Sequence, residues 1–387
     1  MTIRPATPPD APAMLELMES HPAKGGLQML YTRRPDVYRS YLSECPRAEI
    51  TLCLDDSDHL LAQVVCLPRE FYVDGQVRTL GYVTGLHKAQ GSFVNLLRLF
   101  EAGFKRTVAS QYFCSILDDN SEALELFVKH EVLQEICAYT TYLINPRALS
   151  PLAASPHSTQ PQPTQPPVQP RPVQAQTAQP HAAWQQPAAV SSTQAQPLAF
   201  RRATSNDEEQ LLRFYQQQGP RYSFFPVISA VADFPGLDIT DFFLLEDANG
   251  IAAACALWDQ RPFKQYIILG YQGIYQVASR CNPLLHALRY PLLPKAGATA
   301  SVAQLSFLLS RNDCPQAEQL LLGEMSQAAQ DYDCIVIGAV QSDPLDATLK
   351  PLRSFKFTSH ICAISLNSNT HHLIQTTHPP HFSCSLL

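Results

Sequence analysis

A run rich in proline and glutamine limits what this chain folds into more than any other feature, because it divides the 387 residues into two parts. Residues 151–197 contain eleven prolines, eleven glutamines and a single charged residue, Arg171. Such a segment cannot bury enough apolar surface to offset the entropy lost on ordering, and its prolines favour an extended chain. We therefore predict a disordered linker over residues 149–198. The alternative interpretation is a ligand for a proline-recognising domain, carried by residues 165–170.

The composition excludes several classes of protein. Apolar residues make up 45% of the chain and charged residues 16%, and the net charge is −6 with no basic excess in either part. Because neither part carries a net basic charge that would neutralise phosphates, we expect no nucleic acid partner. No apolar run approaches the roughly 20 residues that span a bilayer, and the N-terminus does not resemble a signal peptide. We expect a cytoplasmic protein with no membrane partner.

The cysteines and histidines do not form a metal-binding pattern. The eleven cysteines are odd in number and scattered, without a Cys-x-x-Cys pair or a Cys/His set at zinc spacing. We therefore expect free thiols and no metal. Residues 367–387 carry four histidines but no carboxylate, and we expect a disordered polar tail there rather than a metal site.

The two parts that flank the linker resemble each other. Residues 4–10 and 202–207 both place a short strand before a threonine and an aspartate, which suits the positive end of a following helix. Further along, each part has two apolar runs around an acidic turn, at residues 50–65 and 242–255. An ancient duplication explains this similarity. The predicted domains of shared architecture are residues 1–148 and 199–366.

Hydrophobic periodicity predicts an α/β fold in each part, with helices flanking a mixed, mostly antiparallel sheet. Asp74 and Gly75 give a strong tight-turn signal between two predicted strands. In the first part, strands are predicted at residues 61–72, 77–87, 111–117 and 138–144, and helices at 93–104 and 120–127. In the second part, strands are predicted at residues 303–309, 334–340 and 361–366, and helices at 318–329 and 345–352.

Three short motifs occur in a fixed order in the first part. Residues 3–10 give a strand and a helix start, and residues 80–86 (Leu-Gly-Tyr-Val-Thr-Gly-Leu) give a strand with two glycines. In residues 120–127, Asn is followed by Ala at the third position and by Phe at the seventh. This order and spacing resembles the GNAT superfamily of acyl-CoA-dependent N-acyltransferases. The likeness covers most of residues 1–147 and, more faintly, residues 198–366.

The resemblance implies that acetyl-CoA, or another acyl-CoA, is the co-substrate, and it implies no metal. In this family the pantetheine arm enters between the fourth and fifth strands, which part at a β-bulge, here near residues 82–87. The pyrophosphate accepts hydrogen bonds from main-chain amides that open the following helix. The residues that the resemblance assigns to acyl-CoA binding are Leu86, Lys88, Gln90, Gly91, Ser92, Phe93 and Asn120.

The resemblance also implies that a primary amine attacks the thioester carbon directly, without a covalent enzyme intermediate. His87 is the expected proton relay, because histidine titrates near neutral pH. The family often has a tyrosine where this chain has Phe127, so another hydroxyl must protonate the leaving thiolate. The candidate hydroxyls are those of Tyr82, Tyr112, Ser115 and Ser121, and the predicted catalytic set is His87, Tyr82 and Ser121.

Departures from the family pattern leave a second hypothesis, a catalytically degenerate binding or scaffold protein. The turn at residues 88–93 has Lys88 in place of the usual Arg or Gln, and the bulky Phe93 in place of a small residue. The corresponding turn of the second part, residues 310–315, has no glycine and carries Asp313, so we expect a degenerate second copy. The acceptor is expected to be a small-molecule or peptide amine. The sequence gives no oligomeric state.

Overall fold

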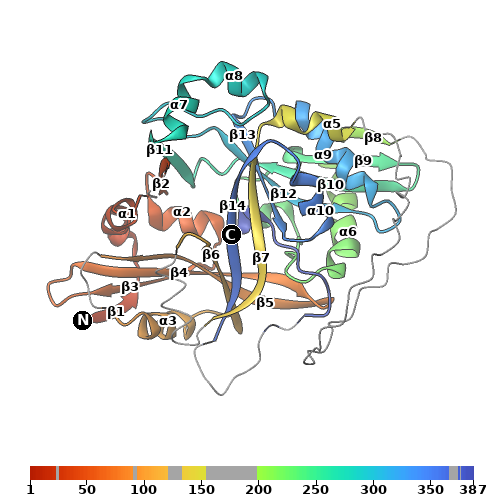
Figure 1. The fold of residues 1–387 in the computed structure, drawn as a ribbon. Coiled ribbons are helices and arrows are strands. Elements are labelled where there is room, and N and C mark those ends of the chain that lie inside the picture. Colours follow the sequence, from red (N-terminus) through yellow and green to blue (C-terminus); the bar gives the residue numbers. More distant parts are fainter. Residues whose placement is uncertain (23–25, 90–93, 121–132, 154–197, 366–373, 375) are drawn as a thin grey trace, which may run out of the picture.

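A single twelve-stranded mixed sheet forms the centre of the protein in the computed structural model (Figure 1). The structure describes residues 1–22, 26–89, 94–120, 133–153, 198–365, 374 and 376–387. The strand order is β1-β3-β4-β5-β6-β14-β7-β13-β12-β10-β9-β8. The predicted α/β class is confirmed, but the two sheets expected from the sequence are continuous with each other.

The first half starts with β1 (Thr2–Pro5) and α1 (Ala11–Glu19), which buries Met14, Leu17 and Met18. Its other strands are β2 (Leu27–Thr32), β3 (Glu49–Leu54), β4 (Leu60–Val73), β5 (Gln76–Lys88), β6 (Gln111–Leu117) and β7 (Leu133–Ile144). Its other described helices are α2 (Val37–Glu44), α3 (Leu96–Phe104) and α5 (Ser150–Ala153). Strands β4, β5 and β6 lie where the sequence predicts them.

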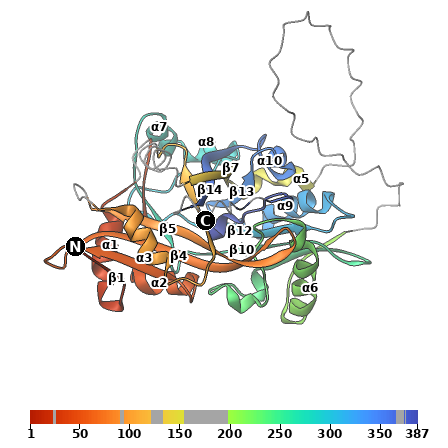
Figure 2. The same cartoon turned by 90° about the horizontal axis from the view of Figure 1, so that it is seen from below.

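The second half repeats the first in the order of its sheet strands. Its strands are β8 (Ala199–Arg202), β9 (Phe242–Asp247), β10 (Gly250–Trp258), β11 (Gln265–Tyr271), β12 (Val302–Ser310), β13 (Cys334–Val340) and β14 (Ser354–Ile364). Its helices are α6 (Glu208–Gln218), α7 (Ile274–Arg280), α8 (Asn282–Ala287), α9 (Gln316–Ala328) and α10 (Pro344–Leu349). Seen from below, the two halves lie side by side along the sheet (Figure 2).

The duplicated motif forms the same local structure in both halves. Arg4 pairs with Asp10, and Arg201 pairs with Asp207, each at 2.7 Å between a guanidinium nitrogen and a carboxylate oxygen. Each aspartate also accepts a hydrogen bond from the main-chain N–H of the threonine three residues earlier. The Arg4 guanidinium lowers the pKa of Asp10 to about 2. These contacts hold each first strand to the start of its helix.

The two halves exchange their last strands. Strand β14 of the second half lies between β6 and β7 of the first half, with Cys362 opposite Cys114 and Thr358 opposite Thr140. Strand β7 in turn pairs with β13 of the second half. In Figure 1 β7 and β14 run together through the middle of the molecule. The sequence left the packing of the halves open, and this exchange joins them through main-chain hydrogen bonds.

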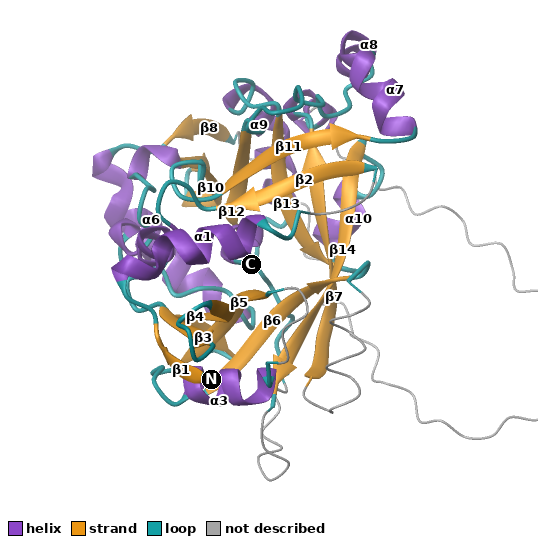
Figure 3. Cartoon of the chain, turned by 90° about the vertical axis from the view of Figure 1, so that its left-hand side faces the viewer, coloured by secondary structure: helices purple, strands orange, loops and turns teal. Residues whose placement is uncertain are grey.

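A second, two-stranded sheet also connects the halves. Strand β2 pairs antiparallel with β11, and Tyr31 lies opposite Tyr266. Figure 3 shows this pair in front of the large sheet, above α1. Neither strand was assigned from the sequence, because each needs a partner from the other half.

The predicted disordered segments need correction at their edges. Residues 376–387 pack into the core, where Phe382 and Leu386 are buried, so this part is not a disordered tail. Asp74 holds its start, since one carboxylate oxygen accepts hydrogen bonds from the N–H groups of Thr377 and His378. At the other segment, residues 149–153 belong to a short helical region packed on α9, with Leu149 fully buried, rather than to the linker. The remaining linker residues, 154–197, lie outside the described residues.

The expected free thiols are present, because all eleven cysteines are unpaired and most are buried. Cys281 alone among them is exposed. Among the described helices, none has the length and apolar character needed to cross a membrane.

Candidate functional site

Strands β5 and β6 part from each other in the middle of the sheet. They pair in parallel over three residues only, ending with Tyr82 opposite Phe113, although β5 runs on to Lys88 and β6 to Leu117. Beyond Tyr82, β6 continues its pairing with β14 on its other side. Within the described chain no strand pairs with this side of β5 beyond Tyr82, so its main-chain groups face an opening in the sheet.

A β-bulge lies in β5 at the start of this opening. The register of β5 with β4 shifts between Thr84 and His87, and Gly85 has a positive φ of 59°. A Cβ on Gly85 would overlap the Tyr41 hydroxyl oxygen, so glycine is the residue that fits this close approach. The parted strands and the bulge are the geometry that the resemblance implies for pantetheine binding.

The predicted residues of β5 divide between the two faces of the sheet. Tyr82 packs in the same buried cluster as Tyr41 of α2 and Met14 of α1. Val83 and Leu86 pack instead with residues of α3. The His87 ring lies 5.9 Å from the His21 ring, just after α1, so His87 shares the face of Tyr82. Two of the three predicted catalytic residues therefore lie along one face.

His87 is a neutral histidine in this environment. Burial, followed by the nearby His21, lowers the pKa of His87 to about 4. The imidazole of His21 contacts the Ser20 hydroxyl at 2.9 Å and the Leu17 carbonyl at 3.1 Å through Nδ1. His87 therefore has an unprotonated nitrogen at neutral pH, as a proton acceptor requires.

The remaining predicted residues are only partly placed. Lys88 ends β5 opposite Ala62, and Asn120 lies in the exposed turn after β6. The others lie outside the described residues, and these are Gln90, Gly91, Ser92, Phe93 and Ser121. The following helix, α3, begins at Leu96 and not at residue 93 as predicted, because the Asn95 side chain accepts a hydrogen bond from the Arg98 N–H and caps the helix there.

Tyr41 is a site residue that the sequence did not identify. Its side chain is buried, and its hydroxyl lies against the bulge at Gly85. Burial raises the pKa of Tyr41, and the facing Arg33 guanidinium, 4.0 Å from the ring centre, opposes part of this rise. The hydroxyl is therefore protonated at neutral pH. The motif signals of β5 say nothing of a side chain from α2, which only the tertiary fold brings to Gly85.

A buried charged cluster around Arg33 packs against the Tyr41 ring. Arg33 forms an ion pair with Glu44 and donates hydrogen bonds to the Tyr31 hydroxyl at 2.7 Å and the Ser40 hydroxyl at 3.1 Å. Burial alone would raise the pKa of Glu44, but Arg33 and Lys264 outweigh it, and that pKa lies below its usual value. A buried ion pair is tolerated only when its remaining polar atoms are hydrogen-bonded. Arg33 meets this requirement through Tyr31 of β2 and Ser40 of α2, and these contacts hold α2 against β2.

The second half has the same opening, but its own chain fills it. Strands β12 and β13 pair over three residues, ending with Gln304 opposite Val336, and the bulge recurs at Phe307, where φ is 57°. Cys384 Sγ contacts the main-chain oxygens of Leu305 and Val336, one on each parted strand. The degenerate second copy expected from the sequence stays a prediction.

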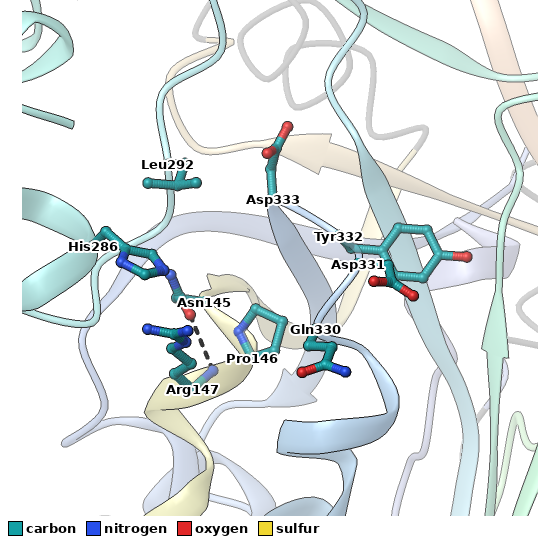
Figure 4. Close-up of a pocket in the computed structure, with 9 residues that line it drawn as sticks. All are labelled: Asn145, Pro146, Arg147, His286, Leu292, Gln330, Asp331, Tyr332 and Asp333. Atoms are coloured by element: carbon teal, nitrogen blue, oxygen red, sulfur yellow. Dashed lines mark hydrogen bonds between the residues drawn. The ribbon is translucent and has the colours of Figure 1, made fainter. Parts of the chain in front are cut away.

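A separate cavity of about 230 Å³ lies between the two halves, with residues 145–147 of the first half on one side and residues 286, 292 and 330–333 of the second half on the other (Figure 4). Its lining includes Arg147, His286, Asp331 and Asp333. Asn145 is already engaged there, since its side-chain oxygen accepts a hydrogen bond from the Arg147 N–H at 3.0 Å. No lining residue belongs to β5, β6 or α3, so this cavity is not part of the opening described above. Among the described residues, no group of three or more potential metal ligands is present.

Parted central strands, a bulge in one of them and a duplicated order of elements define a GNAT-like fold. Among solved structures, the GCN5-related glucosamine N-acetyltransferase region of a fungal multi-domain GH3 β-N-acetylglucosaminidase is similar, with a TM-score of 0.54 and 11% identity. The likeness covers 94% of this chain and 38% of that chain. The predicted resemblance to the GNAT superfamily is thus confirmed at the level of the fold.

Two further similar structures are a GCN5-related N-acetyltransferase from Sphaerobacter thermophilus and the N-myristoyltransferase of Saccharomyces cerevisiae. The first has a TM-score of 0.47 and 11% identity, over 95% of this chain and 96% of that chain. The second has a TM-score of 0.48 and 10% identity, over 91% of this chain and 79% of that chain. No protein-family model and no curated protein sequence matches the chain.

Proposed function

We propose that the protein is an acyl-CoA-dependent N-acyltransferase whose first half is catalytic. The observation that supports this most is the opening between β5 and β6 near the Gly85 bulge, where the main-chain groups on the β6-facing side of β5 have no strand partner among the described residues. Pantetheine amides would pair with these groups as a further strand does. The second half shapes the molecule but does not bind acyl-CoA, because residues near Cys384 occupy its opening.

The acceptor amine binds, in this proposal, on the face of the sheet that carries Tyr82 and His87. As the amine nitrogen bonds to the acyl carbon it becomes a much stronger acid, so an imidazole of low basicity suffices to accept its proton. His87, whose lowered pKa keeps it neutral at physiological pH, would take this role. A main-chain N–H at the bulge would stabilise the oxyanion that forms on the same carbon.

Tyr41 supplies, in this proposal, the proton that the leaving thiolate needs. When the carbon–sulfur bond breaks, the electron pair stays on sulfur and the thiolate takes the hydroxyl proton of Tyr41. This hydroxyl adjoins the bulge at Gly85, and its raised pKa keeps it protonated until then. Tyr82, the hydroxyl predicted from the sequence, lies on the same face with its ring 5.3 Å from that of Phe113, and it is the alternative donor.

The proposal is tested with the full chain and acetyl-CoA. Isothermal titration should give saturable heat, and a panel of primary amines should release CoA thiol in a thiol assay. Heat without thiol release would favour the second candidate, a degenerate binding protein, for which the filled opening of the second half is a precedent within this chain. No heat at millimolar acetyl-CoA would overturn both assignments.

A further inference from the structure

Helices α7 and α8 have no buried residue between them. Short helices of seven and six residues normally form because one face packs against a core. Here the large apolar side chains point away from any core instead. The exposed fractions are 79% for Ile274, 64% for Val277, 58% for Leu284 and 39% for Leu288. We call residues 274–289 the α7–α8 tip.

Polar and aromatic contacts hold the main chain of this tip in place. The Asn282 side chain bonds to both the N–H and the carbonyl of Leu293, at 3.0 and 2.8 Å. The Arg353 guanidinium donates to the Leu288 carbonyl at 2.6 Å, and the ring of Tyr275 lies 5.8 Å from that of Phe355. The tip is therefore an anchored projection with outward apolar side chains, and Figure 3 shows it at one extremity of the molecule.

The segment that carries the tip differs in charge from the whole chain, although Asp331 and Asp333 of another segment line the cavity that His286 of α8 also lines. The net charge of the chain is −6, yet residues 260–312 contain six lysines and arginines and no aspartate or glutamate. Arg280 ends α7 and Arg289 follows α8, and both side chains are exposed. The side chain of Arg353 joins them through its contact with Leu288. Within residues 260–312, every side chain with a permanent charge near these exposed apolar residues in the sequence is therefore a cation.

This combination favours an anionic lipid surface over a second copy of the chain. A symmetric contact between two tips would bring Arg280 and Arg289 of both copies together without an acid from residues 260–312 to neutralise them. The tip is also small, whereas stable dimers bury about 1,200 Å² or more. A membrane requires no matching groove, and it accepts apolar side chains below a ring of basic ones.

We propose that the α7–α8 tip binds the surface of a membrane that contains anionic lipids. Ile274, Val277 and Leu284 enter the interface between headgroups and acyl chains, while Arg280 and Arg289 pair with anionic headgroups. The expectation of no membrane partner rested on the lack of a spanning segment, which does not concern surface binding. The proposal does not depend on the acyltransferase assignment.

The test is co-sedimentation of the full chain with phosphatidylcholine vesicles, with and without phosphatidylserine. We expect binding to the vesicles with phosphatidylserine and its loss at high salt. The double variant Ile274→Ser/Val277→Ser should lower the ratio of bound to free protein at least about tenfold. Arg280→Gln should lower it about fivefold, as expected for one basic residue near an anionic surface.

Val108→Ser is the matched control, because Val108 is exposed to the same 64% as Val277 but lies between α3 and β6. It should bind vesicles as the unaltered chain does. The proposal would be overturned if the double variant bound these vesicles as strongly as the unaltered chain does. It would also be overturned if the unaltered chain did not bind vesicles that contain phosphatidylserine. A third contrary result would be a dimer of the unaltered chain in analytical ultracentrifugation that the double variant does not form. The tip would then bind a second copy of the chain. A lowered unfolding midpoint in the double variant would also count against the proposal, since these side chains would then serve internal packing.

Discussion

At the scale of single residues, His87 makes the stability of the protein depend on pH in a defined direction. The folded state holds its pKa at about 4, below the unfolded value of about 6.5. Between these values the unfolded chain binds a proton that the folded chain does not, so stability falls as the pH is lowered through this window. His87→Gln removes this dependence.

We therefore expect the unaltered chain to lose about 2 kcal/mol relative to His87→Gln between about pH 7 and pH 4.5. Denaturant unfolding of both proteins at the two pH values measures the difference. Other titrating groups contribute equally to both proteins, so their contributions cancel in this comparison. One such group is Glu318, because burial raises its pKa to about 7. A constant difference in unfolding free energy across the range would show that folding does not lower the pKa of His87.

Tyr41 gives a second prediction at this scale, which depends on the proposed function. Tyr41→Phe removes only the hydroxyl beside Gly85, so the ring still packs on Arg33. If the hydroxyl protonates the thiolate, turnover should fall about 100-fold or more, while the affinity for acetyl-CoA changes little. Steady-state kinetics and isothermal titration separate the two effects.

Tyr82→Phe is the control for Tyr41, since Tyr82 lies in the same buried cluster. It should retain most of the activity. A reversed result, with Tyr82→Phe inactive and Tyr41→Phe active, would return the proton donor to the residue expected from the sequence.

At the scale of elements, the bulge in β5 is the feature most sensitive to substitution. In Gly85→Ala the new Cβ meets the Tyr41 hydroxyl, and alanine is strained at a φ of 59°. We expect a loss of about 2–4 kcal/mol in unfolding free energy and weaker acetyl-CoA binding. Thermal unfolding and titration measure both.

Gly297→Ala is a fair comparison for Gly85→Ala, because Gly297 also has a positive φ but has no atom within 4 Å of an added Cβ. It should cost only the conformational strain and leave acetyl-CoA binding unchanged. Equal effects of the two substitutions would show that the contact with Tyr41 does not matter.

Local patterns predict most of the strands, and tertiary pairing explains what they miss. The tight turn at Asp74 and Gly75 joins β4 and β5 as predicted, because turn chemistry and alternation are written within that segment. Residues 27–32 and 265–271 were not predicted, since β2 and β11 pair only with each other across the two halves. Residues 376–387 were predicted to be a disordered tail because of their polar histidines, although this segment buries Phe382 in the core.

The candidate site shows the same division between local and distant information. The sequence places Tyr82, Leu86 and His87 on one strand, and the structure has them there, on the faces that strand alternation and the bulge dictate. Tyr41 and Gly85 are 44 positions apart in the sequence, and the hydrophobic periodicity of neither segment predicts their contact. The charged support from Arg33 is equally distant from β5 in sequence.

The C-terminal segment provides a stability prediction for this element scale. Phe382 is buried, stacks on Phe224 with ring centres 4.6 Å apart, and accepts a hydrogen bond from the Tyr139 hydroxyl at its carbonyl. Phe382→Ala should lower the unfolding free energy by about 3–5 kcal/mol. Chemical denaturation followed by intrinsic fluorescence measures this loss. An effect below about 1 kcal/mol would show that the segment does not pack in solution as described.

At the scale of the whole molecule, the exchange of β7 and β14 decides what can fold alone. Without β14, residues 1–153 would leave β6 and β7 as open edges with no partner between them. Without β7, the second half would lose the neighbour of β13 in the same way. Open edges in the middle of a sheet expose unpaired main-chain groups and favour aggregation. The duplicated halves therefore form one cooperative unit, although each has its own order of elements.

This cooperativity can be tested by dividing the gene within the linker. Residues 1–153 and 198–387, produced separately, should each be insoluble or lack a cooperative unfolding transition. Produced together, they should form a one-to-one complex with an unfolding midpoint close to that of the intact chain, because the strand contacts do not require the linker. The intact chain with a protease site in residues 154–197 is the control, and cleavage there should leave one particle. A soluble 1–153 fragment with its own sharp transition would show that β14 is dispensable to the first half, and acetyl-CoA binding would then have to be measured on that fragment.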